Sequence, residues 1–427
     1  MRYFFGHLLV SFLFFSITTE AFGQSSDAEL KRSTTENISS DDLSGEDLVI
    51  RNAALEALGT AAGTVVVMNA QNGRVYSIVN QDWAIREGFK PCSTIKLVTA
   101  VGGVSERLIG LDGDLENGSY RLGLDDALAY SNNPYFQKVG THMGSRKLID
   151  YAQLLGLGTP TGINAENEYA GRLPFENENL RIYSHADDFE VTPLQLAVMV
   201  SAITNGGRVL VPQIPRNESK KASFRGLYKN YLDIAPTLFE RVIPGMVGAV
   251  NYGTAKGIKI KTNNIAGKTG SCIYKNTWIG LFASVAPIQD PKYSVIVITR
   301  GKYARGKYSA AIAGKIYETL ASRFGEKVDM RLAKYTPSRP EAPRREQEVA
   351  VKPKEEKPKY TPKVRTINQP ELKQTVITYR RDTPAPAPKP RKKTESTPKP
   401  TPKSKGATVI VDGNPEIVRP RVVKPAG

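Results

Sequence analysis

The 427-residue sequence predicts a mixed α/β fold of the α+β type, in which an antiparallel sheet is flanked by helices and joined to an all-helical subdomain. Two strand-like segments come early, a long stretch of helical character follows, and two more strands and a closing helix end the folded part near residue 323. Strands and helices segregated in this way are typical of α+β folds. We therefore expect the first hairpin to pair with the late strands.

The first hairpin is indicated by its residue types. Thr64–Met68 is rich in β-branched side chains, which favour strands. Asn72-Gly73 in the following turn is a strong hairpin signal, and Arg74–Val79 is expected to be the return strand.

The stretch Pro91–Lys96 opens a helix whose apolar run, Leu97–Val101, indicates burial. Ser93 and Lys96 are three residues apart, so on a helix they share one face. Ser93 is expected in the first turn, where unpaired backbone N–H groups and the helix dipole favour a developing negative charge.

A serine hydroxyl is a weak nucleophile near neutral pH, but a neutral lysine amine beside it can take its proton if burial lowers the lysine pKa. We therefore predict Ser93 as the nucleophile and Lys96 as the base. Ser-x-x-Lys alone arises by chance about once in a chain of this length, and a plain helix start is the alternative explanation. Two further motifs in chain order, Ser131-Asn132-Asn133 and Lys268-Thr269-Gly270, favour the catalytic one.

The later elements follow from apolar periodicity and capping residues. Residues 105–200 are expected to be mainly helical, and one helix should begin at the N-cap Thr192, carry Pro193 in its first position and end at Thr204. The remaining predicted elements are a helix over 236–255, strands at Asn276–Val285 and Tyr293–Arg300, and a closing helix at Ala310–Arg323.

The N-terminus has the features of a secretory signal peptide: Arg2, the apolar run Leu8–Phe15, and a small-x-small site at Ala21–Gly23 before Gln24. An uncleaved anchor is the alternative, although the run is shorter than the roughly 20 residues that a spanning helix needs. The predicted divisions are a signal peptide at 1–23, a flexible leader at 24–58 with a helix near Ser44–Leu58 capped by Ser44, a catalytic domain at 59–327 and a disordered tail at 328–427.

The charge of the chain is concentrated in this tail. Residues 331–427 hold 24 Lys and Arg against 10 Asp and Glu, which is +14 of the formal net charge of +17. They also hold 17 of the 28 prolines, which predicts an extended, solvated segment. We expect the tail to bind anionic cell-wall or envelope polymers, and we expect no nucleic-acid partner.

From about residue 60 to 325 the chain resembles the transpeptidase domain of penicillin-binding proteins. The resemblance rests on the three motifs in the family order and on further landmarks along the chain. These landmarks are Asn69…Gly73-Arg74-Val75, Tyr130–Phe136, Leu157–Gly158, Thr161–Ile163, Glu168, Gly171–Pro174, Thr192–Ala197, Asn205–Gly207 and Gly253–Ala255. The resemblance implies a β-lactamase/transpeptidase-like fold and a serine acyl-transfer enzyme.

The resemblance also implies roles for single residues. Ser93 would attack a D-Ala-D-Ala stem peptide of peptidoglycan to form an acyl-enzyme, which an acceptor amine resolves, and Ser131 would relay protons. Lys268 would supply positive charge, and the backbone N–H groups of Ser93 and Ser271 would form the oxyanion hole. The implied substrate contacts are Asn133, Thr269, Gly270 and Ser271.

Family membership would further imply covalent binding of β-lactam antibiotics, no metal or organic cofactor, and a location in the periplasm or cell envelope. The three histidines are unclustered: His7 falls in the signal segment, and His142 and His185 are expected to be surface or structural residues.

Three departures from the family pattern stand out. Cys92 replaces the usual Gly before the nucleophile, Ser271-Cys272 replaces the usual Thr-Ala, and Ser184–Phe189 stands where the family has a Gly-Gln-Gly type turn. Carbapenem-hydrolysing class A β-lactamases are similar in having a disulfide between the matching positions. The resemblance therefore implies a Cys92–Cys272 disulfide, with two buried thiols as the alternative.

Other functions stay open. A class A β-lactamase needs a carboxylate that activates a deacylating water, but no Glu-x-x-Leu-Asn sequence is present, and Glu168 belongs to a Glu-x-x-Gly pattern typical of transpeptidases. A D,D-carboxypeptidase or endopeptidase would share the same fold and motifs. A non-enzymatic wall-docking protein is the remaining alternative.

Overall fold

The computed structural model describes residues 27–258, 265–328 and 330–336. The chain divides into two units, residues 1–344 and 345–427, and every described residue belongs to the first. The predicted signal peptide, and the predicted tail beyond residue 336, lie outside the described residues.

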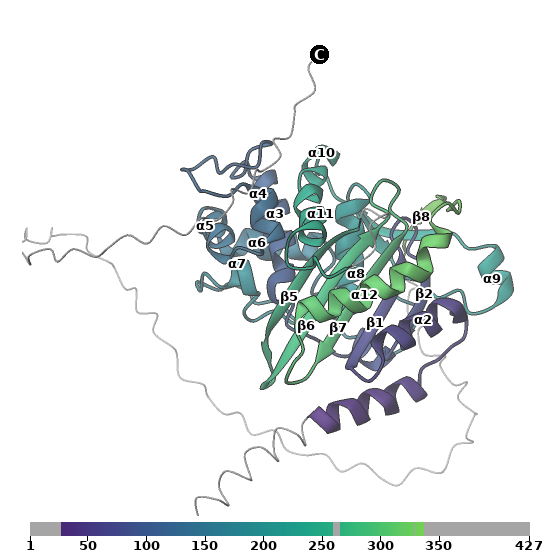
Figure 1. The fold of residues 1–427 in the computed structure, drawn as a ribbon. Helices are drawn as coiled ribbons and strands as arrows, with labels where there is room; N and C mark the ends of the chain where they lie inside the picture. Colours follow the sequence, from purple (N-terminus) through teal and green to yellow (C-terminus); the bar gives the residue numbers. More distant parts are fainter. Residues whose placement is uncertain (1–26, 259–264, 329, 337–427) are drawn as a thin grey trace, which may run out of the picture. The chain divides into compact units, whose positions relative to one another are not determined.

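A five-stranded antiparallel sheet in the order β2-β1-β7-β6-β5 lies in the middle of the first unit (Figure 1). Val66 of β1 lies opposite Ile78 of β2 on one side and Ile296 of β7 on the other. The predicted pairing of the first hairpin with the late strands is therefore confirmed. The strands are β1 (Ala62–Asn69), β2 (Val75–Val79), β5 (Ala266–Tyr274), β6 (Thr277–Ala286) and β7 (Tyr293–Arg300).

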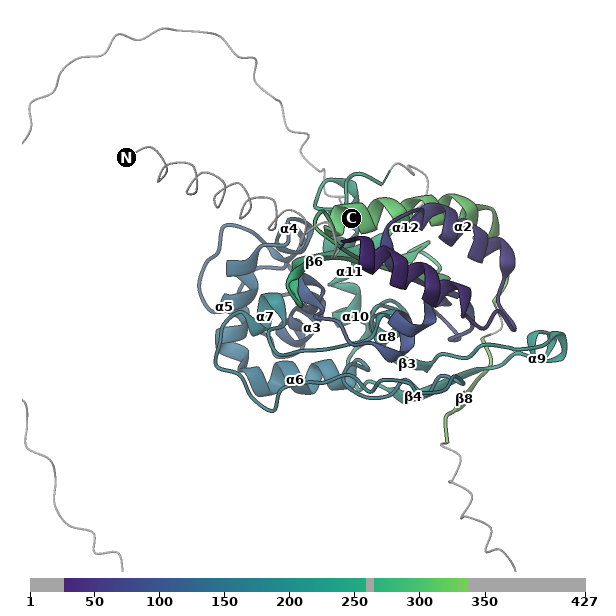
Figure 2. The same cartoon turned by 90° about the horizontal axis from the view of Figure 1, so that it is seen from below.

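Alternating side chains of the sheet enter two separate cores, as the period of a strand requires. Val65 and Val67 face α2 (Leu48–Leu58) and α12 (Gly306–Leu320). Val66 and Met68 face α8 (Pro193–Thr204), whose residues are all buried. Figure 2 shows α2 and α12 along the upper side and α8 below them, in the middle of the molecule. The predicted antiparallel sheet flanked by helices is confirmed.

Helices α3 to α7 form a group at one end of the sheet, as the predicted helical subdomain requires (Figure 1). They are α3 (Lys96–Ser105), α4 (Leu124–Ala129), α5 (Asn133–Met143), α6 (Ser145–Leu154) and α7 (Ile182–His185). Residues 106–123 and 155–181 are largely irregular, so the predicted helical stretch is more broken than expected. Within the described part of the chain, no helix has the length and apolar character needed to cross a membrane.

Local signals located some helices well and others poorly. The Thr192 side chain caps α8, as predicted, and the structure adds a complete capping box with Gln195. The single helix expected over 236–255 is instead two, α10 (Pro236–Glu240) and α11 (Ile243–Asn251). Pro244 explains the break, because proline fits the first turn of a helix and disrupts a helix interior.

A second, three-stranded sheet in the order β3-β4-β8 was not predicted. Its last strand, β8, pairs in parallel with β4, and the Tyr335 N–H donates to the Tyr228 carbonyl at 2.8 Å. The predicted tail boundary at residue 328 is therefore wrong, since residues 332–335 belong to the fold. The elements of this region are β3 (Arg208–Val211), α9 (Glu218–Ala222), β4 (Gly226–Tyr231) and β8 (Leu332–Lys334).

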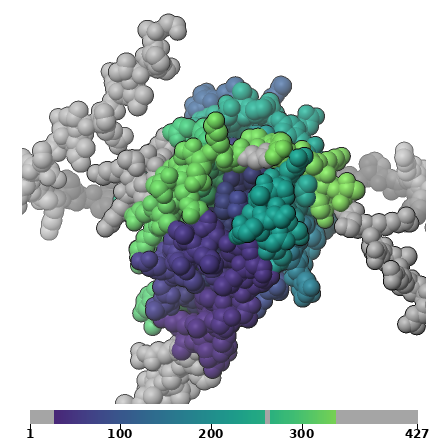
Figure 3. All heavy atoms as spheres, turned by 90° about the vertical axis from the view of Figure 1, so that its right-hand side faces the viewer, coloured from purple at the N-terminus to yellow at the C-terminus, as the bar shows by residue number. Residues whose placement is uncertain are grey.

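The predicted flexible leader is also wrong for its described part, although the helix expected near Ser44–Leu58 is present as α2 (Leu48–Leu58). Residues 27–39 are helical, and α2 begins at Leu48 with Asp47, not Ser44, as its N-cap. The Asp47 side chain accepts hydrogen bonds from the Val49 and Ile50 N–H groups. Figure 3 shows the purple N-terminal residues lying against the rest of the molecule on the face that it draws.

A buried ionic network attaches this segment to the sheet. The Arg51 side chain is 4% exposed and contacts Asp41 at 2.8 Å and Glu46 at 3.0 Å. Asp41 also accepts from the Asn80 N–H, and Glu46 accepts from the Ile78 N–H, both at 2.9 Å. Burial raises the pKa of both carboxyl groups, so each depends on these donors to stay ionised.

We expect Arg51→Ala to lower the free energy of unfolding by about 3–5 kcal/mol, because it leaves two buried carboxylates without their cation. Urea unfolding followed by circular dichroism measures this change. The matched control is Arg32→Ala, which removes an ion pair with Glu36 whose side chains are 71% and 68% exposed. This control should cost about 1 kcal/mol or less, and equal costs for the two variants would contradict the role of the network.

Candidate active site

The predicted nucleophile and base lie at a change of helix type. Ser93 is in the 3-10 helix η2 (Cys92–Ile95), and Lys96 begins α3 directly after it. The first turn was expected to be α-helical, but both side chains still lie on one face, with Lys96 Nζ 2.9 Å from Ser93 Oγ.

Lys96 is fully buried and collects four oxygen contacts from three residues. Besides Ser93 Oγ, its Nζ lies 2.9 Å from the Ser131 carbonyl oxygen, 2.9 Å from Ser131 Oγ and 2.5 Å from Asn133 Oδ1. Burial first, and then the positive charge of Lys268, lower the pKa of Lys96 to about 6. Lys96 is therefore mainly neutral at pH 7.

The partners of Lys96 suit a neutral amine. The Ser131 carbonyl and the Asn133 Oδ1 can only accept hydrogen bonds, so they take the two N–H groups. The nitrogen lone pair is then left for the hydroxyls of Ser93 and Ser131, which lie at equal distance. This arrangement allows Lys96 to accept a proton from either hydroxyl.

Ser131 and Asn133 are placed by the connection between α4 and α5. Ser131 has a φ of 56°, a left-handed conformation that turns the chain sharply after α4. Asn132 then caps α5 by accepting from the Tyr135 N–H at 2.9 Å, and Pro134 occupies the first turn. The local sequence thus holds both side chains against Lys96.

The third motif lies on β5, at the edge of the five-stranded sheet. Lys268 is fully buried, its Nζ donates to the Thr269 carbonyl at 3.0 Å, and burial lowers its pKa to about 7. Thr269 Oγ1 lies 2.6 Å from Thr254 Oγ1, and Ser271 Oγ accepts from the Gly306 N–H at 2.8 Å.

Gly270 lets β5 approach the segment before the nucleophile. A Cβ atom at this position would lie 3.2 Å from the Pro91 carbonyl oxygen and 3.3 Å from Cys92 Cβ. Glycine here therefore lets β5 pack closely against the chain that leads to Ser93.

The Cys92–Cys272 disulfide is present, and its Cα atoms are 5.8 Å apart. The predicted disulfide is confirmed, and the alternative of two buried thiols is wrong. Cys92 has a φ of 48°, in the region that favours glycine, which accounts for the Gly usual at this position in the resembling family. The covalent bond to β5 holds the chain in this conformation.

His185 was expected to be a surface or structural residue, and it is a half-buried residue beside the site. It ends α7, with Nε2 3.4 Å from Asn133 Nδ2 and Nδ1 2.7 Å from Ser184 Oγ. The Ser184 carbonyl oxygen lies 3.4 Å from Ser93 Oγ. His142 is exposed, as expected.

The prediction of site residues also missed Thr254 and Ser184. Thr254 stands in a family landmark, Gly253–Ala255, so its position gave a signal that was not used. Ser184 and His185 stand in the segment that departs from the family, where the resemblance offers no guide.

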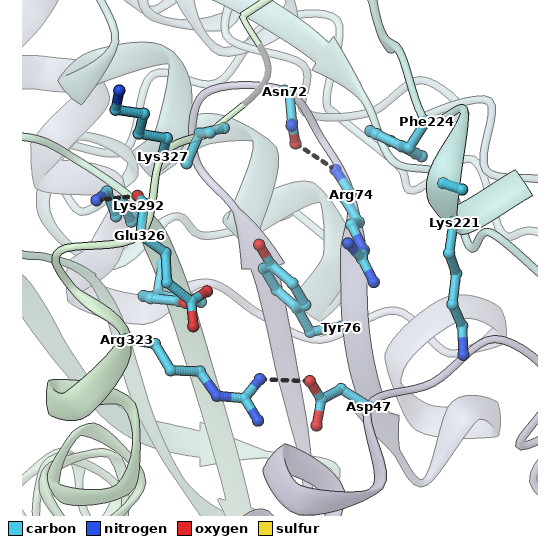
Figure 4. Close-up of a pocket in the computed structure, with 13 residues that line it drawn as sticks. Asp47, Asn72, Arg74, Tyr76, Lys221, Phe224, Lys292, Arg323, Glu326 and Lys327 are labelled. Carbon is cyan, nitrogen blue, oxygen red and sulfur yellow. Dashed lines mark hydrogen bonds and ion pairs between the residues drawn. The ribbon is translucent and has the colours of Figure 1, made fainter. Parts of the chain in front are cut away.

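A separate pocket of about 280 Å³ lies between β2, α9 and the chain that follows α12 (Figure 4). Arg323 donates to Asp47 across it, and the Arg74 guanidinium lies 5.0 Å from the centre of the Tyr76 ring. None of the predicted site residues lines this pocket.

Comparison with known proteins gives a consistent result. The family described as penicillin binding protein transpeptidase domain matches residues 63–318. Stage V sporulation protein D of Bacillus subtilis is 25% identical over 294 residues, which are 59% of this chain and 45% of that protein. Peptidoglycan D,D-transpeptidase FtsI of Escherichia coli is 24% identical over 303 residues, which are 60% of this chain and 50% of that protein.

The chain therefore spans about half the length of the curated relatives it matches. A solved structure, the transpeptidase domain of Burkholderia pseudomallei penicillin-binding protein 3 without ligand, has the same fold with a TM-score of 0.55 at 18% identity, over 70% of this chain and 96% of that one. Since the family match covers more than half of the chain, the protein belongs to the penicillin-binding protein transpeptidase family.

Proposed function

We propose that this protein is an exported D,D-transpeptidase that acts on D-Ala-D-Ala stem peptides of peptidoglycan through an acyl-enzyme on Ser93. The observation that carries the proposal is the contact of Lys96 Nζ with Ser93 Oγ at 2.9 Å, at a buried lysine whose pKa is lowered to about 6. Relatives named peptidoglycan D,D-transpeptidase support the choice of reaction.

In the first half-reaction, Ser93 Oγ attacks the carbonyl carbon of the penultimate D-Ala while Lys96 takes the hydroxyl proton. The C–N bond to the last D-Ala breaks, and Ser131 passes a proton to the leaving nitrogen. Ser131 suits this step because its Oγ is as close to Lys96 Nζ as Ser93 Oγ is, at 2.9 Å. The products are a Ser93 ester and free D-Ala.

In the second half-reaction, an amine of another stem peptide attacks the ester carbonyl. Its proton passes through Ser131 and Lys96 back to Ser93 Oγ, and a new peptide bond forms. The enzyme returns to its starting protonation state, so neither half-reaction needs a further reactant.

Charge in the transition state would be stabilised by groups on η2 and β5. The N–H groups of Ser93 and Ser271 are proposed as the oxyanion hole, in which removal of one donor typically costs about 2.7–4 kcal/mol. Lys268 and Thr269 are proposed to attract and bind the substrate carboxylate, with Asn133 and Gly270 as further substrate contacts. Asn133 faces Lys96 in the same cluster, at 2.5 Å.

Hydrolytic alternatives use the same acyl-enzyme. For a β-lactamase, Glu168 is the carboxylate considered above, but it accepts from the Thr161 N–H and hydroxyl and from the Gly162 N–H. Both carboxylate oxygens of Glu168 are therefore occupied by hydrogen bonds within its own loop, which disfavours a role in activating a deacylating water. A D,D-carboxypeptidase or endopeptidase differs only in that water replaces the acceptor amine.

Ser93→Ala should abolish covalent labelling by penicillin, because it removes the attacking oxygen from a partly exposed side chain. Intact-protein mass spectrometry of the labelled chain, followed over hours, measures the adduct. The melting temperature of Ser93→Ala should stay within about 2 °C of the native value. An adduct that survives in this variant would refute the nucleophile, and rapid loss of the native adduct would favour the β-lactamase.

The rate of acylation should fall about tenfold per pH unit below pH 6, because Lys96 is protonated there and cannot act as a base. Stopped-flow labelling between pH 4.5 and about 8 measures this acid limb. Lys268→Gln removes a positive charge that lowers the Lys96 pKa, so the midpoint should move to higher pH whatever the change in absolute rate. As a control, replacement of the exposed His142 by Gln should leave the midpoint unchanged. A shift of the midpoint in this control would show that Lys96 is not the group responsible for the acid limb.

The C-terminal segment is proposed to bind anionic cell-wall or envelope polymers. Residues 337–427 hold 22 Lys and Arg against 10 Asp and Glu. Deletion of 337–427 should weaken co-sedimentation with cell-wall material, most strongly at low salt, and leave acylation unchanged. Deletion from residue 331 also removes β8 and should in addition lower the melting temperature. Unchanged sedimentation in both variants would rule out the tail as a binding segment.

A further inference from the structure

We propose that His185 is a positioning residue that fixes the side-chain amide of Asn133, and through it the orientation of Lys96. The inference rests on the proposed function, and it goes beyond it by assigning a role to the segment in which this chain departs from its family.

The orientation of the Asn133 amide follows from Lys96. If the lone pair of Lys96 serves Ser93, only N–H groups of the amine are left for Asn133. Asn133 must therefore present its oxygen, which lies 2.5 Å from Lys96 Nζ. Its NH₂ group then points the other way, to His185 Nε2 at 3.4 Å.

This orientation requires one tautomer of His185. The Asn133 NH₂ group can only donate, so His185 Nε2 must accept and the ring proton must be on Nδ1. The Nδ1–H group then donates to Ser184 Oγ at 2.7 Å. Ser184 Oγ also accepts from Gln137 Nε2 at 3.1 Å. A chain of hydrogen bonds thus runs from Lys96 through Asn133 and His185 to Ser184, in which each residue donates to the next.

The chain requires a neutral imidazole, because an imidazolium would place an N–H group against the NH₂ group of Asn133. The ionisable groups facing His185 are Arg181, Lys96, Lys90 and Asp187. Lys96 is neutral at pH 7, so its positive charge opposes protonation of the ring only at acidic pH, where His185 itself titrates. Burial first, and then the charges of Arg181 and Lys96, lower the pKa of His185 to about 4. The ring is therefore uncharged across the neutral range.

The segment that carries His185 is anchored next to the nucleophile. Asp187 accepts from Lys90, three residues before Ser93, and from Arg181 Nε at 2.9 Å. Thr99 of α3 donates to the Tyr183 carbonyl at 2.8 Å. These contacts hold the imidazole between Ser184 and Asn133.

Two amide substitutions distinguish the hydrogen bond made by Nε2 of His185 from the one made by Nδ1. In His185→Gln the longer side chain reaches the Nε2 position and offers an acceptor to Asn133. In His185→Asn the amide reaches only the Nδ1 position, so it keeps the contact with Ser184 and loses the one with Asn133. We expect His185→Asn to lower the second-order rate of acylation by labelled penicillin about fivefold, as for loss of one net hydrogen bond, and His185→Gln to retain most of the native rate.

A double-mutant cycle distinguishes positioning from general destabilisation. In an Asn133→Ala background, His185→Asn should cause little further loss of the acylation rate, because the amide that His185 positions is already absent. Equal losses in both backgrounds would overturn the inference, as would full activity of His185→Asn in the native background.

Nitrogen NMR of the full chain gives a readout that does not depend on activity. The His185 ring should be neutral at pH 7 with its proton on Nδ1, and a proton on Nε2 would overturn the inference. If the native chain is not acylated by penicillin at all, both the proposed function and this inference fail. If the native chain is acylated normally but the double-mutant cycle shows no coupling, only the role of His185 fails.

Discussion

The constraint on which the site depends is a buried amine that has no carboxylate partner among the residues that the structure describes. Lys96 is fully buried, and its contacts are hydroxyl, carbonyl and amide oxygens of Ser93, Ser131 and Asn133. Since an ammonium group is costly to bury among neutral groups, the amine loses its proton near pH 6. The chain thereby obtains a base that is uncharged at neutral pH, provided that the surrounding elements keep it out of water.

The contacts of this amine come from two segments, η2 and the connection between α4 and α5, and each contains an unfavourable backbone conformation. Cys92 and Ser131 are both in the left-handed region, at a typical cost of about 1–3 kcal/mol for each non-glycine residue. The disulfide to β5 offsets this cost at Cys92, and the capped start of α5 holds the chain after Ser131. The scaffold thus stores local strain where it brings the reactive groups together.

The folded unit extends beyond the residues that match the family. The family match covers residues 63–318. Before it, Arg51 is buried with Asp41 and Glu46. After it, β8 pairs with β4. These additions cover the side of the sheet at β2 and close the small second sheet. The contacts of Lys96 come from Ser93, Ser131 and Asn133, all of which lie within the family match.

The sequence by itself determined the order of the three motifs, the hairpin, the bounds of β7 and the start of α8, because each depends on residues close together in the chain. Only the tertiary structure decided that residues 27–58 are packed, since Asp41, Glu46 and Arg51 have the composition of a solvated segment until they pair with one another. It also decided that His185 meets Asn133 across 52 positions of the chain. A contact of that kind leaves no periodicity in the sequence, because it is set by how α7 packs against α3 and α5.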